Sequence, residues 1–321
     1  MTVDQRESAV QRSLGAMDKL GLHAPRRHAL GWCAGLALPG VPGLARAAQA
    51  QAAAVPAPTG AMRVPRPIFV LNSQDATVSV IDPVTWAEQR RIEVGKEPHH
   101  LYLTPDEKSL IVANATGNSL TFIDPATGAV QRTVRDIVDP SHLRFSPDMK
   151  WFVTAANRLN HVDLYRWQPA GAQPFKLLKR IEAPKTPSHL LIDSRSTVVY
   201  ASLQDSDELI AIDLATQAVR WKIKTGKMPA DVFLTKDDKH LLVGLTGDRF
   251  VEVYDVSGAT PRQVKRLATG DGTHAFRARG DGRHVFVSNR VANTISMIDL
   301  QTFEVAAQLP GPAGGRGAGP A

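Results

Sequence analysis

The chain has 321 residues, of which 43% are hydrophobic and 21% are charged, and its formal net charge at pH 7 is +7. This composition is typical of a globular protein and excludes a collagen-like or fully disordered chain. The single cysteine excludes a disulfide scaffold and a cysteine-ligated zinc or iron–sulfur site. Because no run of five or more lysines and arginines occurs, the charge pattern does not indicate a nucleic-acid-binding protein.

Residues 1–50 are predicted to be an export signal. Arg26 and Arg27 precede an apolar run that has the length of a signal-peptide core and is too short to span a membrane. The arginine pair resembles a twin-arginine signal but lacks the usual aromatic residue two positions later, so the general secretory route stays open. We therefore expect a periplasmic or secreted protein without a membrane span in its mature chain. Residues 51–67, rich in alanine and proline, predict a flexible lead-in.

One repeat organises residues 68–309. Short alternating apolar segments that end in aspartate recur at intervals of 39 to 50 residues, and their last residues are Asp82, Asp124, Asp163, Asp213, Asp255 and Asp299. A period near 40–45 residues, with four short strands in each unit, is typical of a β-propeller. The sequence therefore predicts an all-β fold, a β-propeller built from four-stranded antiparallel blades.

The repeats also carry a family resemblance. Residues 69–72, 111–114 and 286–289 resemble the Tyr-Val-Thr-Asn signature of the YVTN-type β-propeller proteins, and Gly-x-x-Pro turns begin at Gly95 and Gly226. In the other repeats the position of the signature asparagine is taken by Ala156, Leu203 and Leu245. Relatives of this type include lactonase-like, d1-haem and surface-layer propellers, so the resemblance implies the fold but does not single out one function.

The sequence supplies fewer strands than a closed propeller ring needs. The chain enters at the second strand position of a blade, residues 68–72, and five full four-stranded units follow. Residues 310–321 are rich in glycine, proline and alanine and predict a disordered tail instead of a closing strand. About six blades are therefore expected, in a truncated seven-blade ring, with a natural six-blade ring as the alternative.

A polar residue recurs where each inner strand is expected to begin. This set consists of His100, His142, His189, Asp231 and His274. Because inner strands line the centre of a propeller, the five side chains are expected to form a ring. Neutral imidazoles with a carboxylate suit zinc, copper, nickel or iron, so His142, His189 and His274 are candidate ligands of a divalent metal. A haem with one axial histidine is a second cofactor hypothesis, and hydrogen bonding to the turns of the blades is a third, purely structural explanation.

Arginines lie in the loops expected beside this ring. They are Arg158, Arg249 and Arg290. Arginine forks suit carboxylate and phosphate groups, so the same face is also interpreted as a funnel for a small anionic ligand. Two further histidines, His240 and His284, are expected to face solvent at the opposite end of the inner strands.

Several enzyme motifs are missing from the sequence. It has no Gly-x-Ser-x-Gly elbow, no phosphate-binding glycine loop, no His-Glu-x-x-His and no haem-attachment motif. We expect a monomeric scaffold that binds a protein or a small anionic ligand and does not bind nucleic acid. The alternative is a metal- or cofactor-dependent enzyme of the lactonase-like or d1-haem-like propeller type. Since Asp231 is the single carboxylate in the ring, binding is favoured over metal-assisted hydrolysis.

Overall fold

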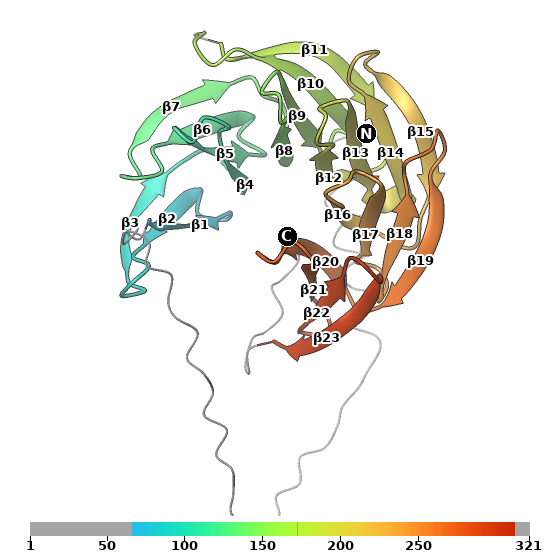
Figure 1. The fold of residues 1–321 in the computed structure, drawn as a ribbon. Coiled ribbons are helices and arrows are strands. Elements are labelled where there is room, and N and C mark those ends of the chain that lie inside the picture. The colour runs from blue at the N-terminus through green and yellow to red at the C-terminus, as the bar shows by residue number, and fades with distance from the viewer. Residues whose placement is uncertain (1–65, 172, 312–321) are drawn as a thin grey trace, which may run out of the picture. The chain divides into compact units, whose positions relative to one another are not determined.

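The computed structural model describes residues 66–171 and 173–311, and these form an all-β fold (Figure 1). Six antiparallel sheets follow one another in chain order, and the strands of each sheet run in sequence from the inside to the outside. The predicted β-propeller with four-stranded blades is therefore confirmed. The predicted signal peptide, and nearly all of the predicted lead-in and tail, lie outside the described residues. No helix in the described part of the chain is long and apolar enough to cross a membrane.

The first sheet has three strands, because the chain enters it at the second strand position, as predicted. These are β1 (Ile68–Asn72), β2 (Thr77–Ile81) and β3 (Glu88–Glu93). Each of the other sheets has four strands. The second sheet contains β4 (Pro98–Leu103), β5 (Leu110–Asn114), β6 (Ser119–Ile123) and β7 (Val130–Arg135), and the third contains β8 (His142–Phe145), β9 (Trp151–Ala156), β10 (His161–Trp167) and β11 (Phe175–Glu182).

The remaining three sheets repeat this arrangement. The fourth sheet contains β12 (Pro187–Ile192), β13 (Val198–Leu203), β14 (Glu208–Asp213) and β15 (Ala218–Lys224). The fifth contains β16 (Pro229–Leu234), β17 (His240–Leu245), β18 (Phe250–Asp255) and β19 (Arg262–Ala268), and the sixth contains β20 (Thr273–Ala278), β21 (His284–Asn289), β22 (Thr294–Asp299) and β23 (Glu304–Pro310). A short 3-10 turn, Gln204–Ser206, follows β13.

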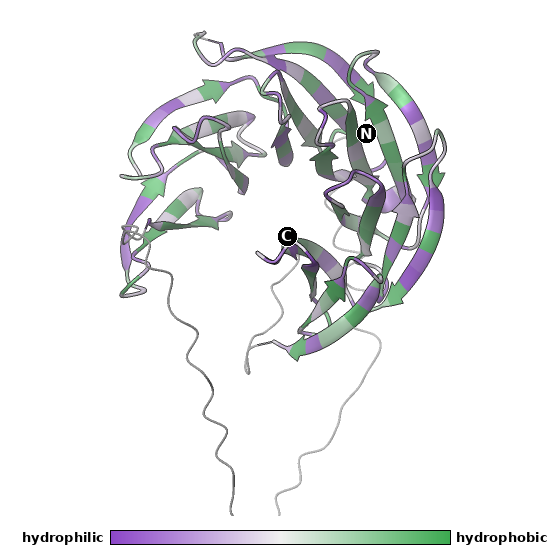
Figure 2. Ribbon diagram, viewed as in Figure 1, coloured by the Kyte–Doolittle hydropathy of each residue, from purple (hydrophilic) through white to green (hydrophobic). Residues whose placement is uncertain are grey.

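The hydrophobic core lies between successive sheets. Alternate residues of a strand point to opposite faces, so Ile111 packs against the third sheet while its neighbour Val112 packs against the first. Each pair of neighbouring sheets shares one such cluster, which gives five clusters in the described residues. None of the five joins the first sheet to the sixth. Along the outer strands, hydrophilic and hydrophobic residues are interspersed, since these strands face solvent (Figure 2).

The two end sheets are buried on one face only. Strands β5 and β9, which lie inside the series, are buried at every position. In β21, by contrast, buried and half-buried residues alternate. Val70 in the first sheet, with Ile295 and Leu309 in the sixth, is exposed although apolar. Among residues 66–171 and 173–311, no neighbouring sheet covers the outer faces of the two end sheets.

The signature asparagines clip together the two middle strands of a sheet. Asn114 donates its side-chain amide to Ser119 Oγ at 3.1 Å and to Thr121 Oγ1 at 3.0 Å. The same pair of hydrogen bonds is made by Asn72 in the first sheet and by Asn289 in the sixth. These bonds satisfy hydroxyl and amide groups that would otherwise be unpaired in the sheet.

Two sheets without the asparagine use a buried carboxylate instead. In the third sheet Asp163 accepts hydrogen bonds from both Nε and Nη2 of Arg180 at 2.8 Å. In the fifth sheet Glu252 accepts from Tyr254 Oη at 2.6 Å and lies 3.6 Å from Nε of Arg266. These sheets therefore also have a polar side-chain interaction near the signature position, but it is made by a carboxylate instead of an asparagine.

Where a glycine precedes an inner strand beside a signature asparagine, close packing requires it. A β-carbon on Gly95 would lie 2.6 Å from the side chain of Asn114, and one on Gly270 would lie 2.9 Å from that of Asn289. Real β-carbons do not approach other atoms so closely, so only glycine fits over the signature asparagine. The predicted turn at Gly95 therefore has a packing reason, and it fixes where the inner strand begins.

Candidate functional site

The strand pairing shows which inner-strand residues are equivalent. Leu101, Leu143, Leu190 and Val232 take the same position, because each pairs with the middle of the following strand. The residues directly before them are His100, His142, His189 and Asp231. These four predicted residues therefore share one register.

The prediction that His274 belongs to this register was wrong. In the sixth sheet Phe276 is the equivalent residue, since it pairs with Val287, and Ala275 precedes it. His274 lies one position earlier and corresponds to His99 in the second sheet. The error arose because Gly272 was aligned with Pro98, whose counterpart in the sixth sheet is Thr273: Pro98 pairs with Asn114 and Thr273 pairs with Asn289.

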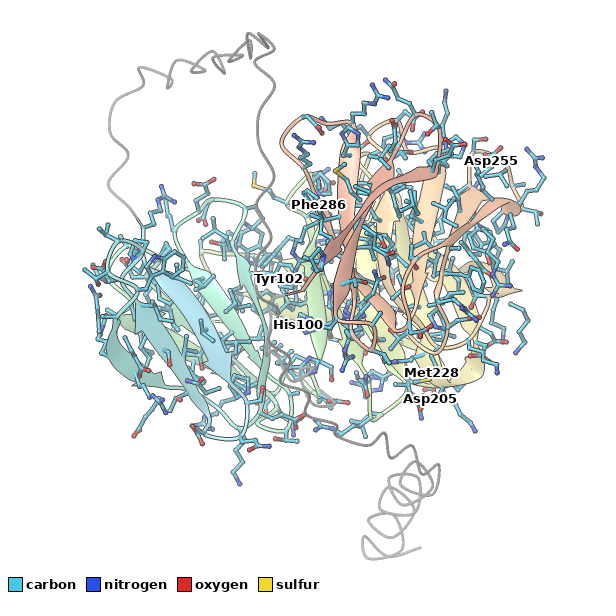
Figure 3. The ribbon with its side chains drawn as sticks, turned by 90° about the horizontal axis from the view of Figure 1, so that it is seen from below. His100, Tyr102, Asp205, Met228, Asp255 and Phe286 are labelled. Carbon is cyan, nitrogen blue, oxygen red and sulfur yellow. The ribbon has the colours of Figure 1, made fainter. Side chains whose placement is uncertain are left out.

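The histidines nevertheless form one continuous cluster at the inner strands. His100, His142 and His189 each bring one ring nitrogen to within 4.8 Å of those of the other two. The ring of His274 lies edge-on to that of His189, with centroids 5.3 Å apart. On the other side His100 stacks on Tyr102, which lies two residues further along β4, with centroids 6.3 Å apart (Figure 3).

Both ring nitrogens of His142 are engaged. Its Nδ1 accepts a hydrogen bond from the backbone N–H of Leu190 at 3.2 Å, which connects the third sheet to the fourth. A neutral imidazole carries one proton, so that proton lies on Nε2, which is 3.0 Å from Tyr102 Oη. His142 therefore connects three sheets and has no lone pair left for another partner.

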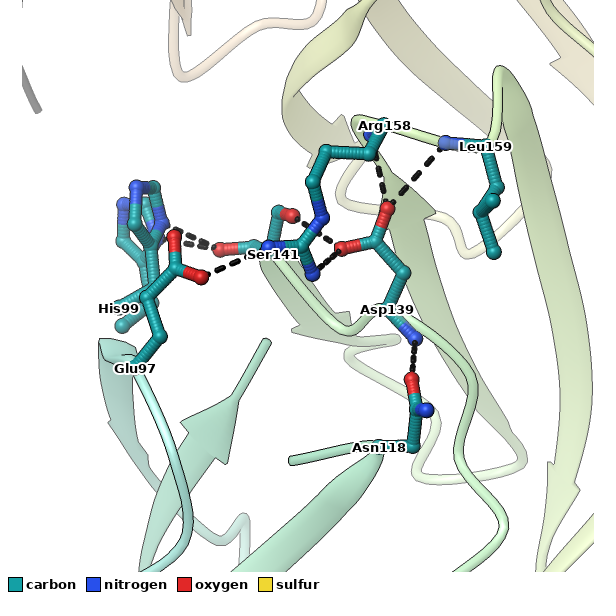
Figure 4. Close-up of polar contacts among 8 residues, drawn as sticks. Glu97, His99, Asn118, Asp139, Ser141, Arg158 and Leu159 are labelled. Carbon is teal, nitrogen blue, oxygen red and sulfur yellow. Dashed lines mark hydrogen bonds and ion pairs between the residues drawn. The ribbon is translucent and has the colours of Figure 1, made fainter. Parts of the chain in front are cut away.

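The second and third sheets are also tied together at the histidine cluster (Figure 4). The backbone carbonyl oxygen of Ser141 lies 2.6 Å from Nδ1 of His100 and 2.8 Å from Nδ1 of His99. Donation to this carbonyl places the proton of His100 on Nδ1. In the fourth sheet Nδ1 of His189 lies 2.9 Å from Ser188 Oγ. His100 and His189 thus present their Nε2 atoms to the interior.

The clustered histidines are held neutral. Burial lowers the pKa of His100 to about 2 and that of His274 to about 4, and it lowers the pKa of His142 and His189 well below the ordinary value. Neighbouring positive charges act in the same direction, since the guanidinium of Arg144 lowers the pKa of His189 further. At neutral pH the cluster therefore consists of uncharged donors and acceptors.

Asp231 takes the role of His142 in the fifth sheet. Its Oδ2 accepts the backbone N–H of Phe276 in the next sheet at 2.9 Å, and its Oδ1 accepts that of Val232 at 3.0 Å. Burial raises the pKa of this carboxyl group. Both carboxylate oxygens thus accept hydrogen bonds from the backbone. A structural role therefore accounts for the polar residue at this position of the fifth sheet.

Two arginines of the site were missed by the sequence analysis. Arg144 and Arg277 lie two positions after the register residues of the third and sixth sheets. Arg144 lies over the ring of Tyr102 at 4.4 Å, and burial lowers its pKa to about 10, with Asp231 opposing this shift. Arg277 lies 3.8 Å from Oδ2 of Asp231, and 81% of its side chain is exposed. The equivalent residues of the other sheets are Tyr102, Leu191 and Phe233, so no polar repeat marks this position in the sequence.

The three predicted loop arginines differ in their surroundings. Arg158 pairs with Glu97 at 2.7 Å and with the buried Asp139 at 2.6 Å, so its guanidinium connects two loops (Figure 4). Arg290 is close enough to His274 to lower the pKa of that ring. Arg249 is exposed. Arg158 is therefore already occupied by carboxylates, whereas Arg290 is near the cluster.

The cluster does not fit a three-histidine metal centre. His142 has no free lone pair while it accepts the N–H of Leu190. Of the three histidines whose ring nitrogens come together, this leaves His100 and His189 to bind a metal ion or a haem iron. Arg144 and Arg277 also place positive charge beside the imidazoles, which disfavours a divalent cation and favours an anion.

The fold and this inner site define a β-propeller with a basic, histidine-rich interior. The chain belongs to the YNCE-like β-propeller family, whose model matches residues 23–318. This membership and the structural neighbours confirm the predicted YVTN-type propeller. A search of curated proteins gave no significant match.

Solved structures with the same fold have diverse descriptions. A hydrazine synthase structure from Kuenenia stuttgartiensis is 18% identical, with a TM-score of 0.64, and the alignment covers 76% of this chain and 83% of that one. A “putative 6-phosphogluconolactonase” from Bacteroides uniformis is 17% identical, with a TM-score of 0.57 and coverages of 71% and 75%. The dihydro-heme d1 dehydrogenase NirN is 16% identical, with a TM-score of 0.55 and coverages of 77% and 64%. At these identities the likeness concerns the fold alone.

Proposed function

We propose that this chain is an exported β-propeller that binds a small organic anion at its inner strands, between Arg144 and Arg277. The observation that carries the proposal is the charge of the site. Two guanidinium groups lie beside histidines that are neutral, and the nearby carboxylate of Asp231 is occupied by two backbone N–H groups. The site therefore carries an excess of positive charge, which an anionic ligand would balance.

The side chains around the two arginines suit an anion with several oxygen atoms. Arginine binds carboxylate and phosphate groups through paired N–H donors. Tyr102 Oη and the free ring nitrogens of His100 and His189 add uncharged hydrogen-bonding groups for hydroxyls. A phosphorylated or carboxylated sugar matches this combination, and the description of the lactonase-like neighbour names such a compound.

Binding is a better account of the site than hydrolysis. General base catalysis needs a group that is free to accept a proton from water. Asp231 holds two backbone amides, and the histidines have strongly lowered pKa values. The lactonase-like alternative therefore lacks an evident base among the residues brought together here.

Isothermal titration calorimetry with 6-phosphogluconate and with inorganic phosphate tests the proposal. We expect 6-phosphogluconate to bind, and Arg277→Met to weaken binding about tenfold or more, because a charge-assisted hydrogen bond contributes about 1.5–3 kcal/mol. Arg135→Met, which changes an exposed arginine of outer strand β7, is the matched control and should bind normally. Binding that rises or stays equal in Arg277→Met, or no binding of either anion, would overturn the proposal. Turnover of 6-phosphogluconolactone that is lost in Arg277→Met would favour the enzyme alternative.

A further inference from the structure

A cavity of about 350 Å³ lies between the fifth and sixth sheets. It is formed by three turns, namely those between β16 and β17, between β20 and β21, and between β22 and β23. The histidines lie at the beginnings of the inner strands, whereas the β16–β17 and β20–β21 turns follow the ends of these strands, so the cavity is at the far end from the histidine cluster. The cavity is therefore separate from the site proposed above.

Two phenylalanines and a leucine form apolar walls of this cavity. Phe233 comes from the end of β16, and Leu300 and Phe303 come from the β22–β23 turn. The ring of His240 lies against that of Phe303, with centroids 4.8 Å apart. Flat apolar side chains on two neighbouring sheets suit an aromatic ring, and the volume is that of a small-molecule site.

The rim of the cavity carries one ammonium group without an ion-pair partner. Arg279 lies 3.4 Å from Asp281, and Arg283 is held by Asp299 at 2.5 Å. Lys236 has no ion pair within the described residues, and its Nζ extends across the cavity to the sixth sheet, 2.7 Å from where a β-carbon on Gly282 would lie.

The two carboxylates on the same turn as Lys236 have other partners. Asp237 accepts hydrogen bonds from Thr235 Oγ1 at 2.7 Å and from the backbone N–H of Lys239 at 3.2 Å. Asp238 accepts from the backbone N–H of Ser194 at 3.2 Å and lies 3.9 Å from Nε of Arg195. The positive charge of Lys236 is thus available at the mouth of an apolar cavity.

We propose that this cavity binds a small aromatic carboxylate. The aromatic ring packs between Phe233 and Phe303, and the carboxylate pairs with the ammonium group of Lys236. An uncharged aromatic compound would not pair with Lys236, and a sugar acid would not pack against the two phenylalanines. The cavity therefore favours a molecule that has both an aromatic ring and a carboxylate. The inference does not depend on the anion site at Arg144 and Arg277.

The backbone at Phe303 allows a sharp test. Phe303 has a φ of 51°, in the left-handed region, and the equivalent residue of the second sheet is Gly128, with a φ of 68°. Glycine adopts this conformation without strain, so Phe303→Gly removes a wall of the cavity while keeping the turn. Trp86 has a φ of 60° at the same position of the first sheet and is 73% exposed, so Trp86→Gly is the matched control.

The experiment is a calorimetric titration with 2-naphthoate and with the uncharged 2-naphthalenemethanol. We expect one equivalent of 2-naphthoate to bind, at least tenfold more tightly than the alcohol. Phe303→Gly should weaken 2-naphthoate binding tenfold or more, and Lys236→Met should weaken binding of 2-naphthoate but not of the alcohol. Trp86→Gly and Arg277→Met should bind normally. Thermal unfolding of each variant shows that the fold is intact.

Three results would overturn this proposal. One is the absence of 2-naphthoate binding to the unchanged chain. Another is equal affinity for the acid and the alcohol, which would show unspecific apolar binding. The third is normal binding by Phe303→Gly or by Lys236→Met. Because Arg277→Met probes the other site, failure of one proposal leaves the other distinguishable.

Discussion

A single imidazole, that of His142, explains why a recurring histidine need not be a ligand. Its Nδ1 accepts the N–H of Leu190, a residue that is fully buried. Asp231 does the same for Phe276 two sheets later. The polar register is therefore in part a device that satisfies the backbone of the next inner strand, where no other acceptor is available.

We expect His142→Asn to be tolerated better than His142→Leu. The Oδ1 atom of asparagine lies close to the place of Nδ1 and keeps the acceptor for Leu190, whereas leucine leaves a buried N–H unpaired, at a cost of about 1–3 kcal/mol. Urea denaturation of the two variants measures the difference. Equal free energies of unfolding would show that the Leu190 hydrogen bond does not stabilise the fold.

At the scale of the strand pair, the two side-chain hydrogen bonds of the buried Asn114 should stabilise the fold more than the same two bonds of the half-buried Asn72. Asn114 is fully buried and bonds to Ser119 and Thr121, so Asn114→Leu leaves two hydroxyls without their partner. Leucine is sterically acceptable there, since the fifth sheet has Leu245 at this position. We expect a loss of about 1–3 kcal/mol in the free energy of unfolding.

The matched control for the strand pair is Asn72→Leu in the first sheet. Asn72 makes the same two hydrogen bonds but is half-buried, so water can replace its partner groups. Chemical denaturation should show a smaller loss for Asn72→Leu than for Asn114→Leu. The reverse order would mean that the clip stabilises the sheet through something other than buried hydrogen bonds.

The strands could be predicted from the sequence because their repeat is local, whereas the site depends on contacts between sheets. The segment around Asn114 identifies a hairpin by itself. The place of His274 was mistaken because Gly272 was matched to Pro98, whereas pairing with Asn289 makes Thr273 the counterpart of Pro98. Arg277 was missed because its counterparts in other sheets include leucine and phenylalanine, so no polar repeat marks the position.

At the scale of the whole molecule, the clustered histidines make the fold sensitive to mild acid. The unfolded chain binds protons at His100, His142, His189 and His274 below about pH 6.5, while burial keeps these groups neutral in the folded state to much lower pH. The unfolded state then holds more protons, so the free energy of unfolding falls as the pH falls. Each histidine contributes up to about 1.4 kcal/mol per pH unit.

We expect the melting temperature to fall steadily between pH 6.5 and about pH 4. Carboxylates with lowered pKa, such as Asp299 at about 2, stabilise the fold above their unfolded pKa and lose this effect only below about pH 4, so they do not account for the change. Differential scanning calorimetry across this range measures it. His142→Asn should flatten the dependence, and a melting temperature independent of pH in the unchanged chain would contradict the prediction.

The sharing of each hydrophobic cluster by two adjacent sheets has a consequence for how the molecule comes apart. Unfolding the sixth sheet disrupts one cluster, whereas unfolding a sheet inside the series, such as the fourth, disrupts two, so partial unfolding costs least at the ends. The imidazoles of His100, His142 and His189 belong to the second, third and fourth sheets, but Arg277 belongs to the sixth. Detachment of that terminal sheet removes one guanidinium and the imidazole of His274, and it leaves the other three imidazoles in place. An anion bound by both arginines would therefore connect the sixth sheet to the third. Its binding would slow the detachment of the sixth sheet, although the anion contacts that sheet through Arg277 alone.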